Sequence, residues 1–337
     1  MRFPRLSIAC LAIFSSFGPA VFAAEDPEPD LASTPSVTEA SPDEVAATVN
    51  GEPIKLGAVS DAVKGILQDR PANPDTLPLL QAEVLSQLID RALVVQIAKK
   101  TGKKLSEEQI DQAVEHVKKQ AEEKQIDFAK SLASRGLTDQ EFREQLTEEM
   151  QFANHLQKAI TDSVMRKYFE AHKTEFDGTE VRVSHILLRP DGVGGAAETE
   201  RLKKIAEKLR GQIESGKRTF EDSAKQLSAG PSRRKGGDLG FIPRQGLMLE
   251  PFSAAAFRLE KGKLSEPVVT PYGVHLIKVT DVKPGRKLMS EVKEQLKAPV
   301  AQEVFKKLAD AEREKAKIVF TGKCPHFKPG TRELADE

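Results

Sequence analysis

The sequence predicts an α+β protein in two parts, a mostly helical N-terminal domain followed by a compact domain of mixed strands and helices. Apolar residues recur at helical spacing through much of residues 79–156. At Val181 the pattern changes to the alternating, β-branched run of a strand, and helix and strand patterns then follow one another for about a hundred residues. A length of 337 residues suits about two domains.

The N-terminal domain begins with a short strand and continues as amphipathic helices. Residues 45–49 are rich in β-branched side chains and precede Asn50-Gly51, which predicts a strand and a tight turn. Capping boxes at Ser106 and Thr138 predict two helix starts, and a last helix is expected near 165–176. The apolar faces suit a small bundle, or a cradle whose faces stay partly open to unfolded clients; the residues alone leave both open.

The second domain is predicted to alternate between strands and helices. Its expected strands are 181–188, a strand entered from the turn Gly236–Phe241, and 273–279, and its expected helices are 202–213, a short one capped by Thr219, and 252–259.

A further helix is predicted over 287–318, where apolar residues recur every four positions. The N-terminal helices are its natural packing partner, which makes the first domain discontinuous in sequence. The expected organisation is a signal peptide (1–23), a disordered linker (24–44), a helical domain (45–177), the α+β domain (178–282), a C-terminal helix packing on the helical domain (283–320) and a polar tail (321–337).

The N-terminus has the pattern of a secretory signal peptide. Arg2 and Arg5 precede a mostly apolar run over 6–17, and Val21 and Ala23 offer small residues at the expected cleavage positions. We therefore expect export to the periplasm or the extracellular medium. The run is too short for a stable membrane span, and no later stretch of 18 apolar residues follows, so no integral membrane span is expected. Removal of Cys10 with the signal leaves Cys324, which predicts no intramolecular disulfide.

Composition and motifs argue against several classes of function. The 51 basic residues balance the 51 acidic ones, and Trp is absent, so neither a basic field nor aromatic platforms favour a nucleic-acid partner. Cys324 and His326 are too few ligands for a zinc site. A hydrolase is disfavoured because the sequence has no nucleophile elbow and no His-Glu-x-x-His motif.

Residues Glu180 to Asp281 resemble a parvulin domain. The resemblance lies in the order and spacing of Val183–Leu187, Phe220–Ser228, Gly236–Phe241, Phe252–Phe257, Pro267-Val268, Thr270 and Gly273–Ile277. The surrounding arrangement is similar to exported chaperones of the SurA and PrsA type, whose helical region starts near a Val-Asn-Gly-Glu-Pro-Ile motif, here Val49–Ile54. The resemblance implies an antiparallel sheet with surrounding helices beside a chaperone-like helical domain.

The resemblance also implies a peptidyl-prolyl cis-trans isomerase that needs no cofactor or metal. Its partners are expected to be unfolded or proline-containing exported polypeptides; whether the chain forms a homodimer stays open. His185, His275 and Thr270 match the family's catalytic positions. The substrate-binding positions of the apolar proline pocket match Leu239, Met248, Phe252 and Phe257.

Two positions depart from the family pattern. Gly230 stands where parvulins usually have Asp or Cys, and Ser232 is the only candidate that a register slip in the 229–235 loop would bring into its place. Tyr272 stands where many parvulins have a small residue. The loop from Pro190 to Gly195 has only Arg189 as a basic neighbour, so phosphate selectivity is not expected. The Gly230 position keeps an alternative open, a catalytically weak or inactive holdase that retains the fold as a binding platform.

Overall fold

The computed structural model describes residues 41–335 apart from 69–71, 75 and 191–194. The expected signal peptide and all but the last residues of the expected linker lie outside this part. The described chain forms two compact units. The first unit runs up to Thr161 and resumes at Ala298, and the second comprises Asp162–Lys297. Within the described residues, no helix combines the length and apolar character that crossing a membrane requires.

The first unit is mainly helical and contains one small sheet. Its elements are β1 (Val45–Val49), β2 (Glu52–Lys55), α2 (Leu56–Leu67), α3 (Leu77–Thr101), α4 (Glu107–Glu123), α5 (Phe128–Ser134), α6 (Asp139–Ala159), the larger part of α12 (Lys293–Arg313) and β7 (Ile318–Phe320). The sheet is antiparallel in the order β2-β1-β7.

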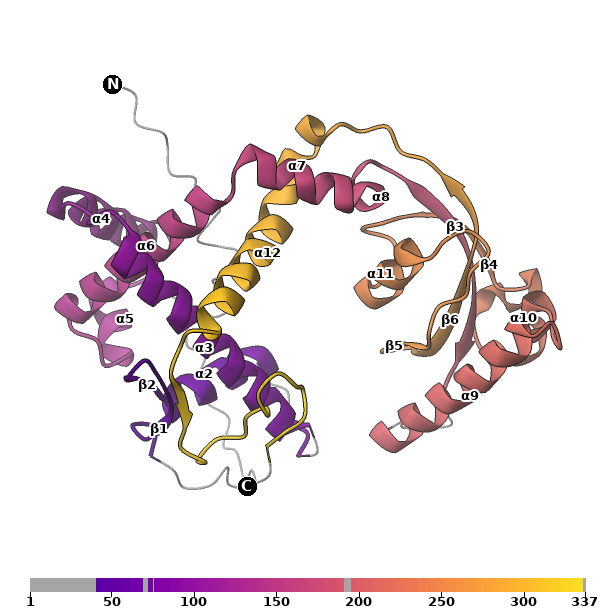
Figure 1. Cartoon of the computed structure of the whole chain (residues 1–337), viewed down its shortest axis with the longest axis horizontal. Coiled ribbons are helices and arrows are strands. Elements are labelled where there is room, and N and C mark those ends of the chain that lie inside the picture. Colours follow the sequence, from indigo (N-terminus) through magenta and orange to yellow (C-terminus); the bar gives the residue numbers. More distant parts are fainter. Residues whose placement is uncertain (1–40, 69–71, 75, 191–194, 336–337) are drawn as a thin grey trace. The chain divides into compact units, whose positions relative to one another are not determined.

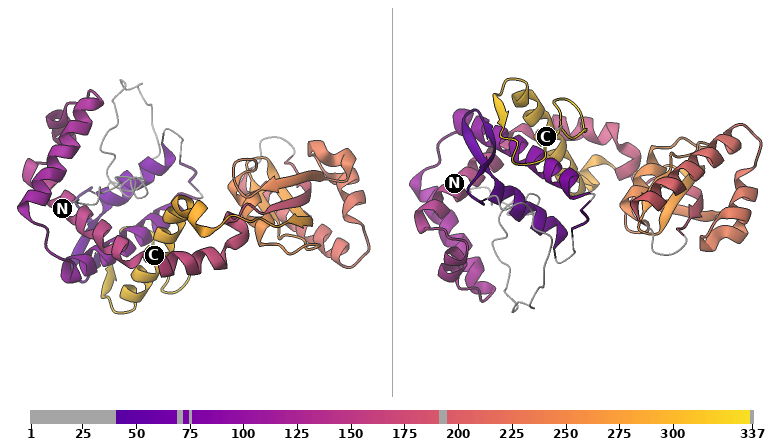
Figure 2. Two further views of the ribbon diagram at one scale, coloured as in Figure 1. Left: turned by 90° about the horizontal axis from the view of Figure 1, so that it is seen from above. Right: turned by 90° about the horizontal axis from the view of Figure 1, so that it is seen from below.

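β1 is the central strand of this sheet. It pairs with β2, which follows it directly in sequence, and with β7 near the C-terminal end of the unit. The predicted turn after it is confirmed, with Asn50 and Gly51 both at positive φ. The Asn50 N–H donates to the Lys317 carbonyl at 2.8 Å, and the Lys317 N–H donates to Asn50 Oδ1 at 2.9 Å. The yellow strand β7 accordingly lies beside the indigo strand β1 (Figure 2).

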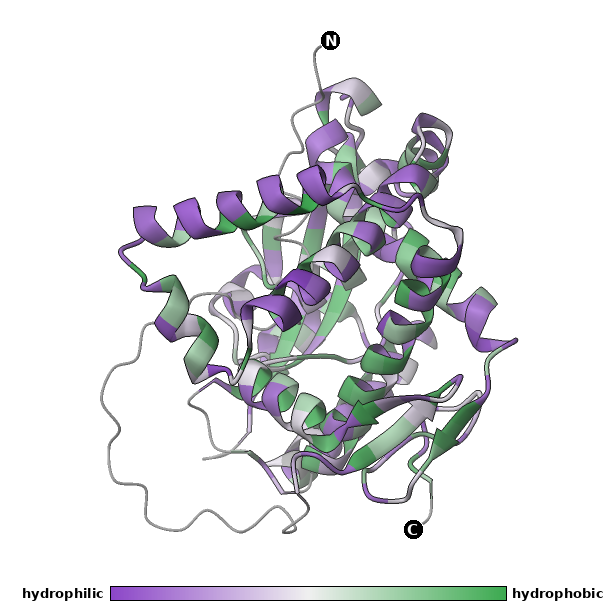
Figure 3. Cartoon of the chain, turned by 90° about the vertical axis from the view of Figure 1, so that its left-hand side faces the viewer, coloured by the Kyte–Doolittle hydropathy of each residue, from purple (hydrophilic) through white to green (hydrophobic). Residues whose placement is uncertain are grey.

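The capping boxes predicted from sequence are confirmed. Ser106 starts α4 and Thr138 starts α6, and in each case the residue three positions later returns the hydrogen bond. The hydrophobic side chains of α4, α5 and α6 form one cluster that includes Ile110 and Phe142. Hydrophobic and hydrophilic residues alternate along the helices (Figure 3), which gives them the apolar stripes that pack in such clusters. Helices α2 and α5 were not predicted.

The C-terminal predictions need two corrections. The helix expected over 287–318 is shorter, because α12 starts at Lys293 and Ile318–Phe320 pairs with β1 as a strand. The expected polar tail is folded onto the first unit. Cys324 is only 5% exposed and lies in the core cluster around β1 and α3, and the Thr321 hydroxyl donates to the Val45 carbonyl at 2.7 Å.

The second unit contains the predicted α+β domain. Its elements are α7 (Asp162–Ala171), α8 (Lys173–Phe176), β3 (Glu180–Leu188), α9 (Ala196–Glu214), α10 (Phe220–Leu227), the 3-10 helix η1 (Pro231–Lys235), β4 (Asp238–Pro243), α11 (Glu250–Arg258), β5 (Val268–Thr270), β6 (Gly273–Lys283), η2 (Met289–Glu291) and the start of α12. The unit begins at α7, upstream of the expected boundary at residue 178.

A four-stranded antiparallel sheet in the order β4-β3-β6-β5 forms the centre of the second unit. In Figure 1, α9 and α10 lie against one face of the sheet and α11 lies against the other. Even-numbered residues such as Ile186 and Leu276 face the α9–α10 core, while odd-numbered residues such as Val183 and Ile277 face α11. This alternation places His185 and His275 on the α11 face.

A small buried network of hydrogen bonds joins the segment before β3 to the segment after β6. Asp177 Oδ1 accepts from the Thr179 N–H at 2.9 Å and from the Thr179 hydroxyl at 2.6 Å. The Gly285 N–H donates to Thr179 Oγ1 at 3.0 Å, and the Lys287 N–H donates to the Asp177 carbonyl at 2.9 Å. These bonds tie the segment before β3 to the segment after β6.

Candidate active site

The two predicted histidines meet in the centre of the sheet. His185 on β3 and His275 on β6 come from adjacent antiparallel strands, and Leu187 is the register partner of His275. Their Nδ1 atoms are 3.2 Å apart, and the rings are stacked with centroids 5.4 Å apart. Both side chains are buried. For this contact to be a hydrogen bond, one ring must carry its proton on Nδ1 and donate it to the unprotonated Nδ1 of the other.

Thr270 on β5 holds the other end of His275. Its Oγ1 lies 2.8 Å from His275 Nε2 and accepts from the Tyr272 N–H at 3.2 Å. Thr270 Oγ1 has two possible acceptors for its proton, His275 Nε2 at 2.8 Å and the Gly273 carbonyl oxygen at 3.5 Å. The shorter distance favours donation to His275 Nε2, which leaves the His275 proton on Nδ1, facing His185.

Burial keeps this pair neutral. It lowers the pKa of His185, and together with the neighbouring charge of a protonated His185 it lowers the pKa of His275 to about 4. At neutral pH both rings are therefore uncharged, and their hydrogen bonds are those of neutral imidazoles.

The four predicted pocket residues share one apolar cluster on the α11 face. Phe252 is 4% exposed and stands edge-on to both rings, with centroids 5.7 Å from His185 and 5.4 Å from His275. Leu239, Met248 and Phe257 are partly buried in the same cluster. The structure thus brings every predicted site residue together around Phe252 and the histidine–threonine chain.

Gly230 lies directly against His185. A Cβ at this position would be 2.9 Å from His185 Nε2 and 3.3 Å from Ser228 Oγ. Ser228, which sequence analysis did not assign to the site, is 1% exposed and accepts from the Leu187 N–H and the Gly230 N–H, both at 3.1 Å. Ser228 lies within the Phe220–Ser228 segment that resembles the parvulin family, and this match is the sequence signal that could have indicated its role. Ser228 therefore fixes the close approach of Gly230 to the ring.

Exposed apolar side chains occur in the loops next to the pocket residues. Leu247 and Leu249 flank Met248 in sequence and are 59% and 41% exposed. Tyr272, at the turn between β5 and β6, is 59% exposed, and its backbone is anchored to Thr270. The loop after β3, expected to lack phosphate-binding residues, includes 191–194 and so lies mostly outside the described residues.

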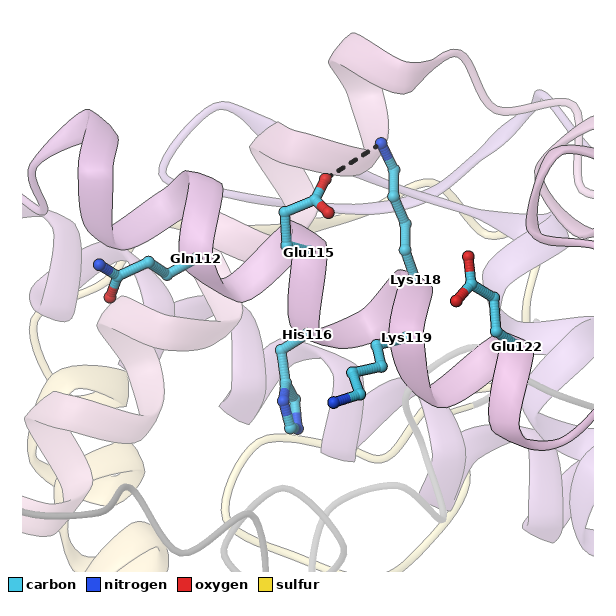
Figure 4. A pocket seen from close by; sticks show the side chains of 6 residues that line it. All are labelled: Gln112, Glu115, His116, Lys118, Lys119 and Glu122. Carbon is cyan, nitrogen blue, oxygen red and sulfur yellow. Dashed lines mark ion pairs between the residues drawn. The ribbon is translucent and has the colours of Figure 1, made fainter.

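A separate hollow on α4 does not resemble a catalytic site. It is lined by Gln112, Glu115, His116, Lys118, Lys119 and Glu122 (Figure 4). All six side chains belong to one helix, and the Lys118–Glu115 pair joins neighbouring turns at 3.7 Å. Across the described residues, no group of three His, Cys, Asp or Glu side chains is arranged to hold a metal ion.

Family models match both parts of the chain. The PPIC-type PPIase domain matches residues 185–281, and the SurA-like N-terminal domain matches residues 13–172.

Several curated proteins are similar to this chain over most of its length. A probable parvulin-type peptidyl-prolyl cis-trans isomerase from Bordetella pertussis is 31% identical over 277 residues, which cover 81% of this chain and 91% of that protein. Foldase protein PrsA from Bacillus subtilis is 33% identical over 66% of each chain. Chaperone SurA from Alcanivorax borkumensis is 28% identical over 72% of this chain and 58% of its own length. The chain therefore belongs to the parvulin-type peptidyl-prolyl cis-trans isomerase family, in a form that carries a SurA-like N-terminal domain.

Proposed function

We propose that this chain is an active peptidyl-prolyl cis-trans isomerase that also acts as a folding chaperone for exported proteins. Membership of a family that includes foldases and chaperones supports the general activity. The observation that carries the catalytic proposal is the buried chain of Thr270, His275 and His185 beneath Phe252.

The proposed chemistry is rotation about the X-Pro amide bond. This rotation costs about 18–20 kcal/mol because the twisted amide loses its resonance. A catalyst accelerates it by binding the twisted amide better than either planar isomer, and an apolar pocket assists by removing water from the carbonyl. The reaction breaks no covalent bond, so it needs neither a nucleophile nor a metal.

In this proposal Leu239, Met248, Phe252 and Phe257 form the pocket that receives the proline ring. The histidine pair supports the pocket from below and does not transfer a proton to the substrate. Its low pKa supports this division of roles, since both rings stay uncharged across the physiological pH range. Thr270 fixes the orientation of His275 and thereby of the pair.

The proposed clients are unfolded, proline-containing polypeptides on the secretory route. The SurA-like N-terminal match supports a chaperone role for the helical unit. The expected signal pattern at residues 1–23 supports export.

A second candidate function is that of a holdase with little or no isomerase activity. Gly230 favours it, because the usual Asp or Cys side chain is missing next to His185 and a side chain there would meet the ring. Such a protein would suppress client aggregation without accelerating prolyl exchange.

Exchange spectroscopy on an unphosphorylated X-Pro peptide separates the two functions. We expect the mature protein to accelerate cis–trans exchange and His275→Ala to lose most of that acceleration. His116→Ala is the matched control, because His116 is exposed on α4, and it should leave the rate unchanged. Uncatalysed exchange in the presence of folded protein would overturn the isomerase proposal and leave the holdase.

A further inference from the structure

Two buried polar atoms next to the candidate site have no partner among the described residues. They are His185 Nε2 and Ser232 Oγ. His185 is 6% exposed and Ser232 is 8% exposed, so bulk water does not compensate either atom. An unpaired buried polar group costs about 1–3 kcal/mol, so two such groups in one region require an explanation.

The backbone places these two residues in the same neighbourhood. The His185 N–H donates to the Gly237 carbonyl at 2.9 Å, and the Gly237 N–H donates to the Ser232 carbonyl at 3.0 Å. Gly230, two residues before Ser232, packs against the His185 ring on the side of Nε2. Ser232 is therefore held close to His185 by both routes, along the chain and across Gly237.

We propose that Ser232 is a positioning residue whose hydroxyl pairs with His185 Nε2, directly after rotation about its Cα–Cβ bond or through one buried water. This inference rests on the proposed isomerase function and adds a fourth member to its hydrogen-bond chain. The chain then runs from Thr270 through His275 and His185 to Ser232.

A hydroxyl suits this position because it both donates and accepts. When Thr270 donates to His275 Nε2, the His275 Nδ1–H donates to His185 Nδ1, and His185 Nε2–H needs an acceptor. In the opposite arrangement His185 Nε2 carries no proton and needs a donor. Ser232 Oγ satisfies both arrangements, whereas a carboxylate at position 230 would accept only. The rings stay neutral in each.

Nitrogen-15 spectra of the histidine side chains test the proposal directly. We expect Ser232→Ala to shift the His185 Nε2 resonance and to change the tautomer balance of the pair. The matched control is Ser253→Ala, because Ser253 in α11 is a fully buried serine whose hydroxyl also has no partner among the described residues. That control should leave the His185 Nε2 resonance in place. Ser232→Thr keeps the hydroxyl and should restore the native resonance.

Activity provides the second measurement. Loss of one buried hydrogen bond predicts a kcat for prolyl exchange reduced about fivefold in Ser232→Ala, with KM little changed. An unchanged His185 resonance in folded Ser232→Ala, or an equal shift in Ser253→Ala, would overturn the Ser232 assignment. Absence of exchange catalysis by the unsubstituted protein would instead overturn the proposed function, while the spectra still decide whether Ser232 contacts His185.

Discussion

At the scale of single residues, Gly230 is the position where one added carbon matters most. Its φ of −76° is accessible to any residue, so backbone strain does not explain the glycine. The contact at 2.9 Å to His185 Nε2 does, because a Cβ there forces the ring or the Gly230 segment to move. We expect Gly230→Ala to lower the free energy of unfolding by about 1–3 kcal/mol, as measured by urea denaturation.

Gly211→Ala is the matched control for that substitution. Gly211 lies within α9, and a Cβ there meets nothing within 4 Å. We expect alanine to stabilise the helix by up to about 1 kcal/mol. Equal losses at both positions would show that contact with His185 is not the cause at Gly230.

The histidine pair makes a prediction about pH. The pKa of His275 in the folded protein is about 4, below the unfolded value of about 6.5. The unfolded state therefore binds more protons between these values, and stability falls as pH drops from 6.5 toward 4. An NMR titration of His275 should show a midpoint near 4. The pH dependence of unfolding should be shallower in His275→Ala over this window; identical slopes would contradict the assignment.

At the scale of secondary-structure elements, the start of α6 depends on a reciprocal cap. Thr138 Oγ1 accepts from the Glu141 N–H at 3.2 Å, and Glu141 Oε2 accepts from the Thr138 N–H at 2.8 Å. We expect Thr138→Ala to cost about 1 kcal/mol in urea denaturation. Thr101→Ala is the control, because the Thr101 hydroxyl donates to the Ile97 carbonyl at the C-terminal end of its own helix and so caps no helix start. A similar loss in both variants would rule out a capping effect.

At the scale of the whole molecule, the strand β7 closes the sheet of the first unit. Truncation after Lys317 removes its pairing with β1 and exposes the buried residues Ala47 and Val49. We expect faster amide exchange in β1 and α3, measured by hydrogen exchange, while amides of β3 and β6 keep their protection. Truncation after Thr321 retains β7 and should be milder. Loss of protection throughout β3 and β6 would contradict independent stability of the second unit.

The sequence predicted the strands that carry the candidate site better than it predicted the C-terminal segment. The predicted strands 181–188 and 273–279 are β3 and β6, which carry His185 and His275, because strand periodicity follows directly from residue order. Ile318–Phe320 looked like the end of a helix, because a three-residue strand depends on a partner more than 250 residues away. The segment that contains Cys324 was predicted as a polar tail for the same reason. The burial of Cys324 raises the thiol pKa to about 11, and neither effect leaves a local signal.

The pairing of β1 with β7 also determines the order in which the two units can fold during synthesis. The first strand of the sheet leaves the ribosome, or emerges from a translocation pore, about 270 residues before the strand that completes it. All of the second unit appears within that interval and has the residues it needs to fold at once. The helical unit must wait with an open strand edge until residue 320 has emerged. In its proposed role as a folding factor, the chain thus passes through a stage at which its own strand edge needs protection.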